Sequence, residues 1–495
     1  MRPKVSWLLP HASSTTAVPS ERRRGLLAVV VACIARNPGH DRSSPGSMRF
    51  PHHLPLYATG ARFTPSPGPV PTLSLDGRSC PQRQRQIQVM QACMCSAEGQ
   101  LMNGTGPLDG IKVLDLSVMI SGPLAGMMLA DQGADVIKVE SPGLGDIMRF
   151  LGSNKGGVTG IFLNNNRGKR SLVLNLKQPD GVALLKRLVE QADVFIQNFR
   201  PGAMERLGLG YESLAAINPN LIYTSISGYG PDGPMSHRRV YDNVIQAASG
   251  LASVQTDPAT GVPSMYRTLV CDKTTAYTVA QAITAALYAR ATGKAAGQHI
   301  VVSMLDAAIA FMWPDSAMDA VLLDDDVQRA ATIGANYAVT ELADGYMSAG
   351  AITDAEFKGL CAALGHPEMG DDPRFKTTAD RMQHLGELVG LMRQYAMETT
   401  VEAFLARAED HDVPASAILA LDEIADSPQV QHNEMFVERE HPVAGRVREP
   451  RPAARMSATP QRLGDHAPLF GQHSDEIVRE LGLDPGPLRA AGIIH

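Results

Sequence analysis

The sequence predicts an α/β protein with a doubly wound parallel sheet, and three observations support this prediction. Strand-like and helix-like segments alternate from residue 110 to residue 303. The first strand, helix and second strand occupy about thirty residues, the length of a right-handed βαβ unit. Hydrophobic residues make up 44% and charged residues 19% of the 495 residues, as in globular proteins of two or three folding units.

The first βαβ unit has the clearest pattern. Residues 111–116 predict a buried strand, and residues 134–140 predict a second one. Between them, residues 123–132 carry Leu and Met at helical spacing, and Gly133 follows where a helix C-cap is expected. A crossover of this kind places the two strands in one parallel sheet.

The same alternation continues along the chain. Strands are predicted at 171–176, 193–199, 221–226 and 298–303, and helices at 180–191, after Pro201-Gly202, and at 274–291. This order is typical of a Rossmann-like sheet. A dinucleotide-binding sheet would carry Gly-x-Gly-x-x-Gly after its first strand, but residues 117–126 lack that spacing. The pattern therefore does not favour NAD as a ligand.

The periodicity changes character near residue 325, after the acidic residues 324–326. From there to residue 400, short strands within 343–352 are followed by helices at 354–364 and 378–397. This segment predicts a smaller α+β domain. Helical segments return after residue 401, and the last one begins at Ser474, a candidate N-cap.

Charge is distributed unevenly along the chain, whose formal net charge is −6. Residues 1–101 contain 12 Lys and Arg against 4 Asp and Glu, which leaves 33 basic and 47 acidic residues in 102–495. An acidic body with 5% aromatic residues argues against a nucleic-acid partner. No later segment approaches the length of about 18 uninterrupted apolar residues that would predict a membrane span.

The first hundred residues differ from the rest. They are rich in Pro, Ser, Arg and His and show little periodicity, so we expect residues 1–101 to be a disordered extension. An Arg-rich stretch before the apolar residues 25–35 resembles a secretory signal or a transit peptide. The alternative is a start codon assigned too early, with the functional protein beginning at Met102.

The six cysteines show the same division. Four lie in residues 1–101, where Cys93 and Cys95 lack the nearby His residues of a metal site. Only Cys271 and Cys361 lie in the body of the chain. Two isolated cysteines do not make a disulfide framework, so we expect a reducing, cytoplasmic compartment.

Several distinct motifs occur in order along the body of the chain. These are residues 110–116 (GIKVLDL), Gly122-Pro123, 129–140 (LADQGADVIKVE), Gly145-Asp146, 166–177 (NRGKRSLVLNLK), 193–202, 293–308, 412–414 (DVP) and 467–473 (APLFGQH). In this order they resemble the class III CoA-transferases of the CaiB/BaiF group, which includes formyl-CoA transferase and has the α-methylacyl-CoA racemases as relatives. The resemblance covers residues 108–485 and leaves the first hundred residues without a counterpart.

The resemblance implies a specific organisation. A large Rossmann-like domain is expected from both ends of the chain, residues 106–324 and 401–495, with residues 325–400 as the small domain. Two protomers are expected to interlock as a homodimer. The resemblance also implies that coenzyme A and acyl-CoA are substrates, with no tightly bound cofactor and no metal.

Asp272, in residues 268–275 (TLVCDKTT), aligns with the catalytic aspartate of the family. It precedes the predicted helix at 274–291, whose dipole favours an ionised carboxylate. By resemblance, this carboxylate attacks the donor thioester to give a mixed anhydride, and the released CoA thiolate then forms an aspartyl-CoA thioester that the acceptor acid opens. The alternative is that Asp272 only caps the helix.

Tyr241 separates two activities of the superfamily. The racemase relatives have His at this position, and a phenol with a pKa of about 10 replaces imidazole poorly near neutrality. The sequence therefore favours transfer of CoA from an acyl-CoA donor to a carboxylic acid. The alternatives for the protein are a racemase or isomerase, and a CoA-binding protein without catalysis. The alternative for Tyr241 is that it is a packing aromatic.

An acidic protein needs several well-placed cations and backbone donors to bind CoA. By family position, the candidates lie mostly in loops after predicted strands, where open α/β sheets bind ligands. They are Met119, Ser121, Leu174, Lys177, Asn198, Phe199, Arg200, Arg206, Arg239 and Tyr241. Ile120 and Ser141 depart from the family, because formyl-CoA transferase has an amide and an arginine there.

Overall fold

The computed structural model describes residues 106–495 apart from 258–259, 330–331, 333 and 335–336. Our predictions for residues 1–101, including the disordered extension and the Cys93-x-Cys95 pair, lie outside the described residues. The alternative start at Met102 lies outside them as well.

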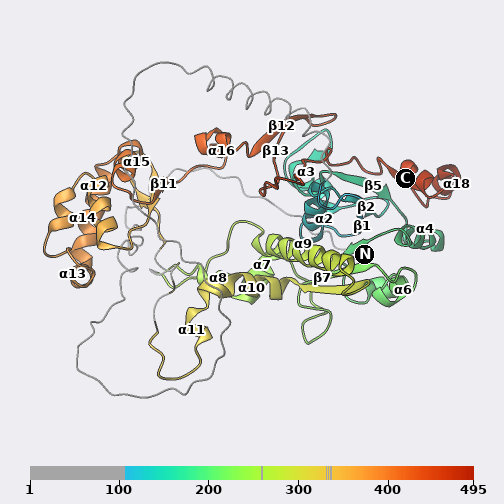
Figure 1. Ribbon diagram of the computed structural model, residues 1–495, viewed down its shortest axis with the longest axis horizontal. Coiled ribbons are helices and arrows are strands. Elements are labelled where there is room, and N and C mark those ends of the chain that lie inside the picture. Colours follow the sequence, from blue (N-terminus) through green and yellow to red (C-terminus); the bar gives the residue numbers. More distant parts are fainter. Residues whose placement is uncertain (1–105, 258–259, 330–331, 333, 335–336) are drawn as a thin grey trace, which may run out of the picture. The chain divides into compact units, whose positions relative to one another are not determined.

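Six parallel strands form the main sheet, in the order β5, β2, β1, β6, β7, β8 (Figure 1). Counted along the sheet, this is the order 3-2-1-4-5-6 of a Rossmann-like sheet. The predicted parallel α/β class is therefore confirmed. Such a sheet binds ligands where the strand order reverses, here outside the carboxyl ends of β1 and β6. The strands are β1 Lys112–Asp115, β2 Asp135–Glu140, β5 Lys169–Val173, β6 Val194–Gln197, β7 Ile222–Ser227 and β8 Gln298–Ser303.

Helices cover both faces of this sheet and bury two apolar cores. On one face α2 and α9 pack against each other, and α10 joins them (Figure 1). On the other face lie α4, α5 and α6. Successive strand residues alternate between the two cores, so Val113 faces the α2 side and Leu114 the α4 side. The bounds are α2 Ser121–Asp131, α4 Pro179–Val189, α5 Ala203–Arg206, α6 Tyr211–Ala215, α9 Val270–Ala291 and α10 Met304–Ser316.

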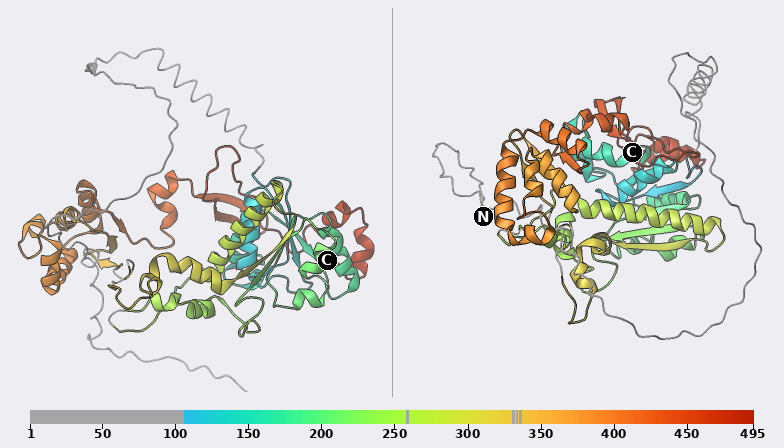
Figure 2. Two further views of the ribbon diagram at one scale, coloured as in Figure 1. Left: turned by 60° about the horizontal axis from the view of Figure 1, so that its bottom comes forward. Right: turned by 60° about the vertical axis from the view of Figure 1, so that its left-hand side comes forward.

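The end of the chain packs on the edge strand β5. Both views of Figure 2 show the red C-terminal helices α17 (Ser474–Glu480) and α18 (Pro485–Ala490) beside the green helices. Leu174 forms an isolated bridge with Ile494. The prediction that Ser474 caps its helix is wrong. The N-cap is His473, and the Ser474 hydroxyl instead accepts a hydrogen bond of 3.1 Å from the Val173 amide.

A third hydrophobic core extends from Leu342 to Val413. Its helices surround a three-stranded antiparallel sheet of β9, β10 and β11. The long helix predicted at 378–397 is divided at His384, whose backbone leaves the helical region. The domain boundaries themselves stay a prediction. The elements are β9 Thr340–Glu341, β10 Tyr346–Ala349, α12 Asp354–Ala363, α13 Thr378–Gln383, α14 Leu385–Met397, α15 Val401–Asp410 and β11 Ala415–Ala417.

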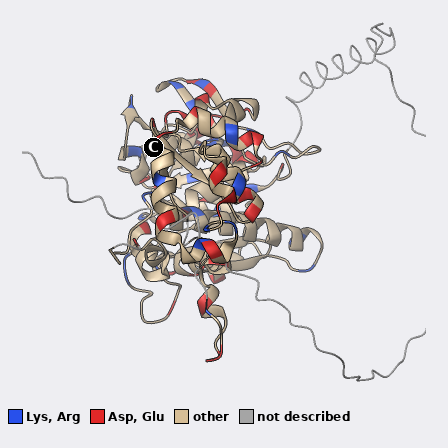
Figure 3. Ribbon diagram, turned by 90° about the vertical axis from the view of Figure 1, so that its left-hand side faces the viewer, with Lys and Arg blue, Asp and Glu red and all other residues tan. Residues whose placement is uncertain are grey.

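Several short elements were not predicted, because their patterns are too brief for periodicity to detect. They include the hairpin β12–β13, which packs through Ala444 against η2 and α3. Figure 3 shows acidic and basic residues interspersed over the described chain. No helix in the described part of the chain is long and apolar enough to cross a membrane. These elements are η2 Ile147–Phe150, β3 Asn154–Lys155, β4 Val158–Thr159, α3 Gly160–Asn166, α7 Asp242–Ser249, α8 Leu251–Val254, α11 Met318–Val321, η4 Pro367–Asp371, η5 Ile424–Asp426, α16 Pro428–His432, β12 Phe436–His441 and β13 Gly445–Pro450.

Candidate active site

The loop between β1 and α2 is held by side chains from several elements. The Ser117 amide donates a hydrogen bond of 3.0 Å to Oδ1 of Asp115, at the end of β1. The amide of Val118 donates to Oδ1 of Asn198 at 2.9 Å, and Nδ2 of Asn198 donates back to the Val118 carbonyl at 2.7 Å. Asn198 therefore joins the loops after β1 and β6, the two strands at which the sheet order reverses.

Met119 has an unusual backbone in this loop. Its φ of 64° lies in the left-handed region, which costs a non-glycine residue roughly 1 kcal/mol. Strained backbone of this kind persists only where surrounding contacts enforce it, and it clusters at functional sites. Two residues later, Ser121 begins α2.

Asp272 lies at the same end of the molecule, in the first turn of α9. The prediction that it precedes the helix is wrong, because α9 begins at Val270 rather than near residue 274. The Asp272 amide is satisfied by Oδ2 of Asp242, 3.0 Å away, which lets the helix start earlier. The N-cap is Leu269, so Asp272 is not the N-cap residue of α9.

The Asp272 carboxylate is buried and only 8% of the residue is exposed. Burial first, and then repulsion from the neighbouring Asp242, raise its pKa to about 6. The hydroxyl and the amide of Ser121 act in the opposite direction and stabilise the ionised form. The starts of α2 and α9 thus meet at this carboxylate, which is ionised near neutral pH but has lost most of its hydration.

Asp242, at the start of α7, is itself fixed in place. Nε2 of Gln246, one turn later, donates to Oδ1 of Asp242 at 2.6 Å. The same amide donates to the carbonyl oxygens of Tyr266 and Thr268, just before α9. This arrangement fixes the start of α7 against the start of α9.

Cys271 is adjacent to Asp272 in sequence but does not offer a competing nucleophile. Its side chain is fully buried in the core formed with Ile245 and Leu251. Burial raises the pKa of the thiol to about 12, so the reactive thiolate is not formed near neutrality.

A cavity of about 410 Å3 opens beyond the carboxyl ends of β1, β2, β5 and β6. Three predicted CoA-binding residues, Leu174, Lys177 and Phe199, line it. Its remaining wall is largely apolar and comes from the loops after β1, β2 and β5 and from α5. The lining also includes Leu116, Val118, Ser141, Pro142, Ala203, Met204 and Leu207. The cavity therefore lies where a Rossmann-like sheet binds its ligand.

Uncompensated cations lie at or near this cavity. Lys177 lines it, and Arg206 is on α5, which supplies part of the wall. Arg200 follows β6 in the same loop as Phe199. None of these three side chains forms an ion pair within the part of the chain that the structure describes, and all are exposed. They are free to pair with phosphate groups.

The other predicted residues fall into two groups. Met119 and Ser121 lie between β1 and the start of α2, beside Asp272, and Asn198 of the loop after β6 contacts that segment; none of the three lines the cavity. Arg239 and Tyr241 lie in the segment before α7, and Tyr241 directly precedes Asp242. Tyr241 is 67% exposed, so it is not a core aromatic of this chain.

Two further acidic residues at this site were not identified from the sequence. Asp242 stands next to Tyr241, and Asp146 belongs to the Gly145-Asp146 motif, yet neither position indicates a contact with the loop or with α9. A carboxylate at the start of a helix is usually interpreted as a cap, and that interpretation hides partners distant in sequence.

The sequence is similar to known proteins and to one family along most of its length. The model for CoA-transferase family III matches residues 108–474. Succinyl-CoA:glutarate CoA-transferase of Homo sapiens is 36% identical over 402 residues, which cover 79% of this chain and 91% of that protein. Succinyl-CoA–D-citramalate CoA-transferase of Chloroflexus aurantiacus is 33% identical over 381 residues, covering 76% and 94%.

Solved structures agree with this assignment. The crystal structure of a CaiB/BaiF family protein from Brucella suis matches with a TM-score of 0.69 and 32% identity. The match covers 77% of this chain and all of that one. The matched family region contains the parallel sheet and the third core. The chain therefore belongs to CoA-transferase family III.

Proposed function

We propose that this CoA-transferase moves CoA from an acyl-CoA donor to a carboxylic acid through covalent intermediates on Asp272. The observation that carries the proposal is a buried carboxylate at the junction of two helix starts, with its pKa raised to about 6. Such a group is ionised at neutral pH and poorly hydrated, which makes it a better nucleophile than an exposed aspartate.

The proposed reaction has four steps. An Asp272 oxygen attacks the thioester carbonyl, and the C–S bond breaks to give a mixed anhydride and CoA thiolate. The thiolate attacks the aspartyl carbonyl, which forms an enzyme thioester and releases the donor acid as its carboxylate. The acceptor carboxylate then attacks this thioester, and the returning thiolate attacks the acceptor carbonyl and regenerates Asp272. Each intermediate is an anhydride or a thioester, so the activation of the donor is conserved and exchange needs no external energy.

The cavity at the carboxyl edge supports CoA as the common substrate. Its apolar wall at Leu174 and Met204 suits an adenine ring, and Lys177 and the nearby Arg206 supply charges for the phosphates. Asn198 connects this region to the loop that contains Ser121, beside Asp272. We infer that the pantetheine arm follows this loop from the cavity to the nucleophile.

The relatives support a narrower substrate class. Both named transferases use succinyl-CoA as donor, and both acceptors, glutarate and D-citramalate, are dicarboxylic acids. We therefore propose succinyl-CoA as the donor and a short dicarboxylic acid as the acceptor.

Incubation of the purified protein with succinyl-CoA and single acids tests this function. We expect a new acyl-CoA, identified by mass spectrometry, with glutarate or a related dicarboxylate from a panel that also includes oxalate, malonate and citramalate. The racemase alternative predicts instead that an acyl-CoA is converted to its isomer without any acceptor acid. A protein that only binds CoA would form no new thioester and no covalent adduct.

Replacing Asp242 with Asn is expected to shift the acidic limb of the pH–rate profile to lower pH by about one unit. The Asp242 charge raises the pKa of Asp272, so its removal lowers that pKa below about 6 while Asn keeps an oxygen for the Asp272 amide. The measurement is kcat/KM between pH 4.5 and 8. Asp242→Glu, which keeps the charge, is the control and should retain the wild-type limb. An unchanged limb in Asp242→Asn would contradict the role of this charge.

Exposed aromatic side chains support a homodimer, which we also propose. Tyr277 and Tyr288 on α9, and Phe311 and Trp313 on α10, are all more than two-fifths exposed. A second copy of the chain would remove this apolar surface from water.

The two described cysteines, Cys271 and Cys361, are free and buried, which is consistent with the cytoplasmic location that we propose.

A further inference from the structure

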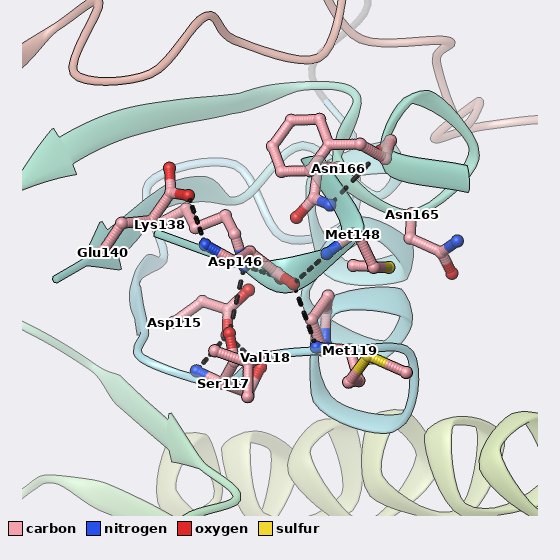
Figure 4. Close-up of polar contacts among 12 residues, drawn as sticks. Asp115, Ser117, Val118, Met119, Lys138, Glu140, Asp146, Met148, Asn165 and Asn166 are labelled. Carbon is pink, nitrogen blue, oxygen red and sulfur yellow. Dashed lines mark hydrogen bonds and ion pairs between the residues drawn. The ribbon is translucent and has the colours of Figure 1, made fainter. Parts of the chain in front are cut away.

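A buried ion pair lies directly beneath the β1–α2 loop. Lys138 of β2 and Asp146, the N-cap of η2, both have side chains that are 0% exposed, and Nζ lies 2.8 Å from Oδ2 (Figure 4). Removing two charges from water costs free energy that mutual attraction offsets only when the geometry and the hydrogen bonds are good. A hydrophobic pair would serve packing alone at lower cost, so the position of this pair calls for another role.

The pair contacts both ends of one short backbone segment. Nζ of Lys138 donates to the Ser117 carbonyl at 3.0 Å, and the amide of Met119 donates to Oδ1 of Asp146 at 3.2 Å. Figure 4 shows these contacts converging on the loop from one side. Between them, Val118 is held by Asn198. Residues 117–119 are therefore each fixed by a side chain from a different part of the chain.

Asp146 is itself fixed in place. Its own amide donates to Oε1 of Glu140 at 3.1 Å, and its Oδ1 also accepts from the Met148 amide at 3.0 Å. Arg149 donates to both oxygens of Glu140, from Nε to Oε1 at 2.8 Å and from Nη2 to Oε2 at 2.7 Å. The acceptor for Met119 is thus rigid, as a group must be if it is to enforce a strained backbone.

The enforced conformation is the left-handed φ of 64° at Met119. Without the Asp146 acceptor, a non-glycine residue would relax to negative φ and rotate the chain that follows. That chain begins α2 and includes Ser121, whose hydroxyl and amide stabilise the Asp272 carboxylate. The geometry at Asp272 therefore depends on a contact made by Asp146.

We propose that Asp146, paired with Lys138, is a positioning residue that holds Met119 left-handed and so aims Ser121 at the Asp272 carboxylate. This inference rests on the proposed function of Asp272. It predicts that Asp146 affects acylation of Asp272 far more than the affinity for CoA, whose proposed phosphate and adenine contacts lie in the cavity at Leu174 and Lys177.

The test measures the first turnover in Asp146→Ala, as succinate released from succinyl-CoA and as the covalent CoA adduct on the intact protein, because the thiolate released first is recaptured at Asp272. We expect the acylation rate to fall about 100-fold, with the Kd of free CoA within about fivefold of wild type by calorimetry. The acidic limb of the acylation rate should move to higher pH, because Ser121 no longer stabilises the ionised carboxylate. A parallel loss of CoA affinity, or an unmoved limb, would contradict the proposal.

Two backgrounds at residue 119 separate positioning from general damage. In Met119→Gly, glycine adopts positive φ without strain, so adding Asp146→Ala should cost about tenfold or less. In Met119→Ala, which keeps the Cβ, the same addition should still cost about 100-fold. Each double variant is compared with its own single variant at residue 119. Equal losses in the two backgrounds would overturn the proposal.

Asp131→Asn is the matched control, because Asp131 forms a buried pair with Arg167 that does not contact the loop. It should lose stability but acylate at a rate within about threefold of wild type. A wild-type protein that releases no succinate and forms no adduct would refute the function of Asp272 itself. Wild-type acylation that persists unchanged in Asp146→Ala would refute only the positioning role.

Discussion

Replacing Asp272 with Asn will lower the rate of acyl transfer at least about 1,000-fold. An amide of nearly the same shape keeps the packing at the start of α9, but it cannot form an anhydride with the acyl group. The remaining activity is limited to direct attack of the acceptor carboxylate on the thioester, without a positioned and poorly hydrated nucleophile of the enzyme. The measurement is formation of the new acyl-CoA by mass spectrometry, with intact-protein mass to detect the adduct.

Asp306 offers a matched control for this result. It occupies the same position in the first turn of α10 that Asp272 occupies in α9, but it is exposed. Asp306→Asn should keep transfer activity within about threefold of wild type. Asp272→Asn activity within tenfold of wild type would refute covalent catalysis at this residue. An adduct that persists in Asp272→Asn would place the nucleophile elsewhere.

The same substitution, Asp272→Asn, will stabilise the folded protein at pH 8 by about 3 kcal/mol. The pKa of Asp272 is raised from 3.8 to about 6 on folding, so the folded state disfavours the ionised form. Wild type carries none of this penalty below pH 3.8, gains it as pH rises between the two values, and carries all of it above pH 6. Asn is neutral in both states and avoids the penalty. Its advantage should therefore be large at pH 8 and small near pH 4.

Urea denaturation followed by circular dichroism at pH 4, 6 and 8 measures this difference. Asp306→Asn, on the exposed start of α10, is expected to show no gain of this size at any of the three values. An Asp272→Asn advantage that is equal at pH 4 and pH 8 would mean that improved packing, rather than removal of a buried charge, causes it. When replacing a catalytic residue makes the folded protein more stable, the wild-type site has retained a group that catalysis needs at the expense of folding stability.

Several strands of the main sheet were predicted well. Residues 111–116 and 134–140 contain β1 and β2, and residues 298–303 coincide with β8. The central strands β1 and β2 are buried on both faces of the sheet, so their apolar residues already describe their surroundings. The edge strand β8 instead has alternating exposure, the other pattern that indicates a strand. The order of the alternating segments also predicted the class of the sheet, since crossover handedness leaves few arrangements.

Strand β5 shows where this kind of argument fails. The prediction placed the strand at 171–176, whereas β5 spans Lys169–Val173. Lys169 is buried and donates to Asp115 on β1, and Arg170 pairs with Asp135 on β2. A basic residue is usually assigned to the surface, because its charge must be compensated before it can be buried. Its acidic partner here is more than thirty residues away and is brought close only by the sheet.

The residues of the candidate active site also fall into those that the sequence identified and those that it did not. Asp272 and several cavity residues, such as Lys177 and Phe199, were identified by motif, because a family resemblance preserves residue types in order. Their roles stay predictions. The contacts of Asp242 and Asp146 could not be predicted, since each carboxylate acts on a backbone amide about thirty residues away.

Local sequence determined which segments form strands and helices, because periodicity records burial of a segment's own side chains. The tertiary structure decided where α9 begins, how Met119 is strained and why the pKa of Asp272 is raised. Each of these depends on free energies between groups distant in sequence, namely desolvation, repulsion between two carboxylates and a buried ion pair. Those terms exist only once the chain has folded and excluded water from the groups concerned.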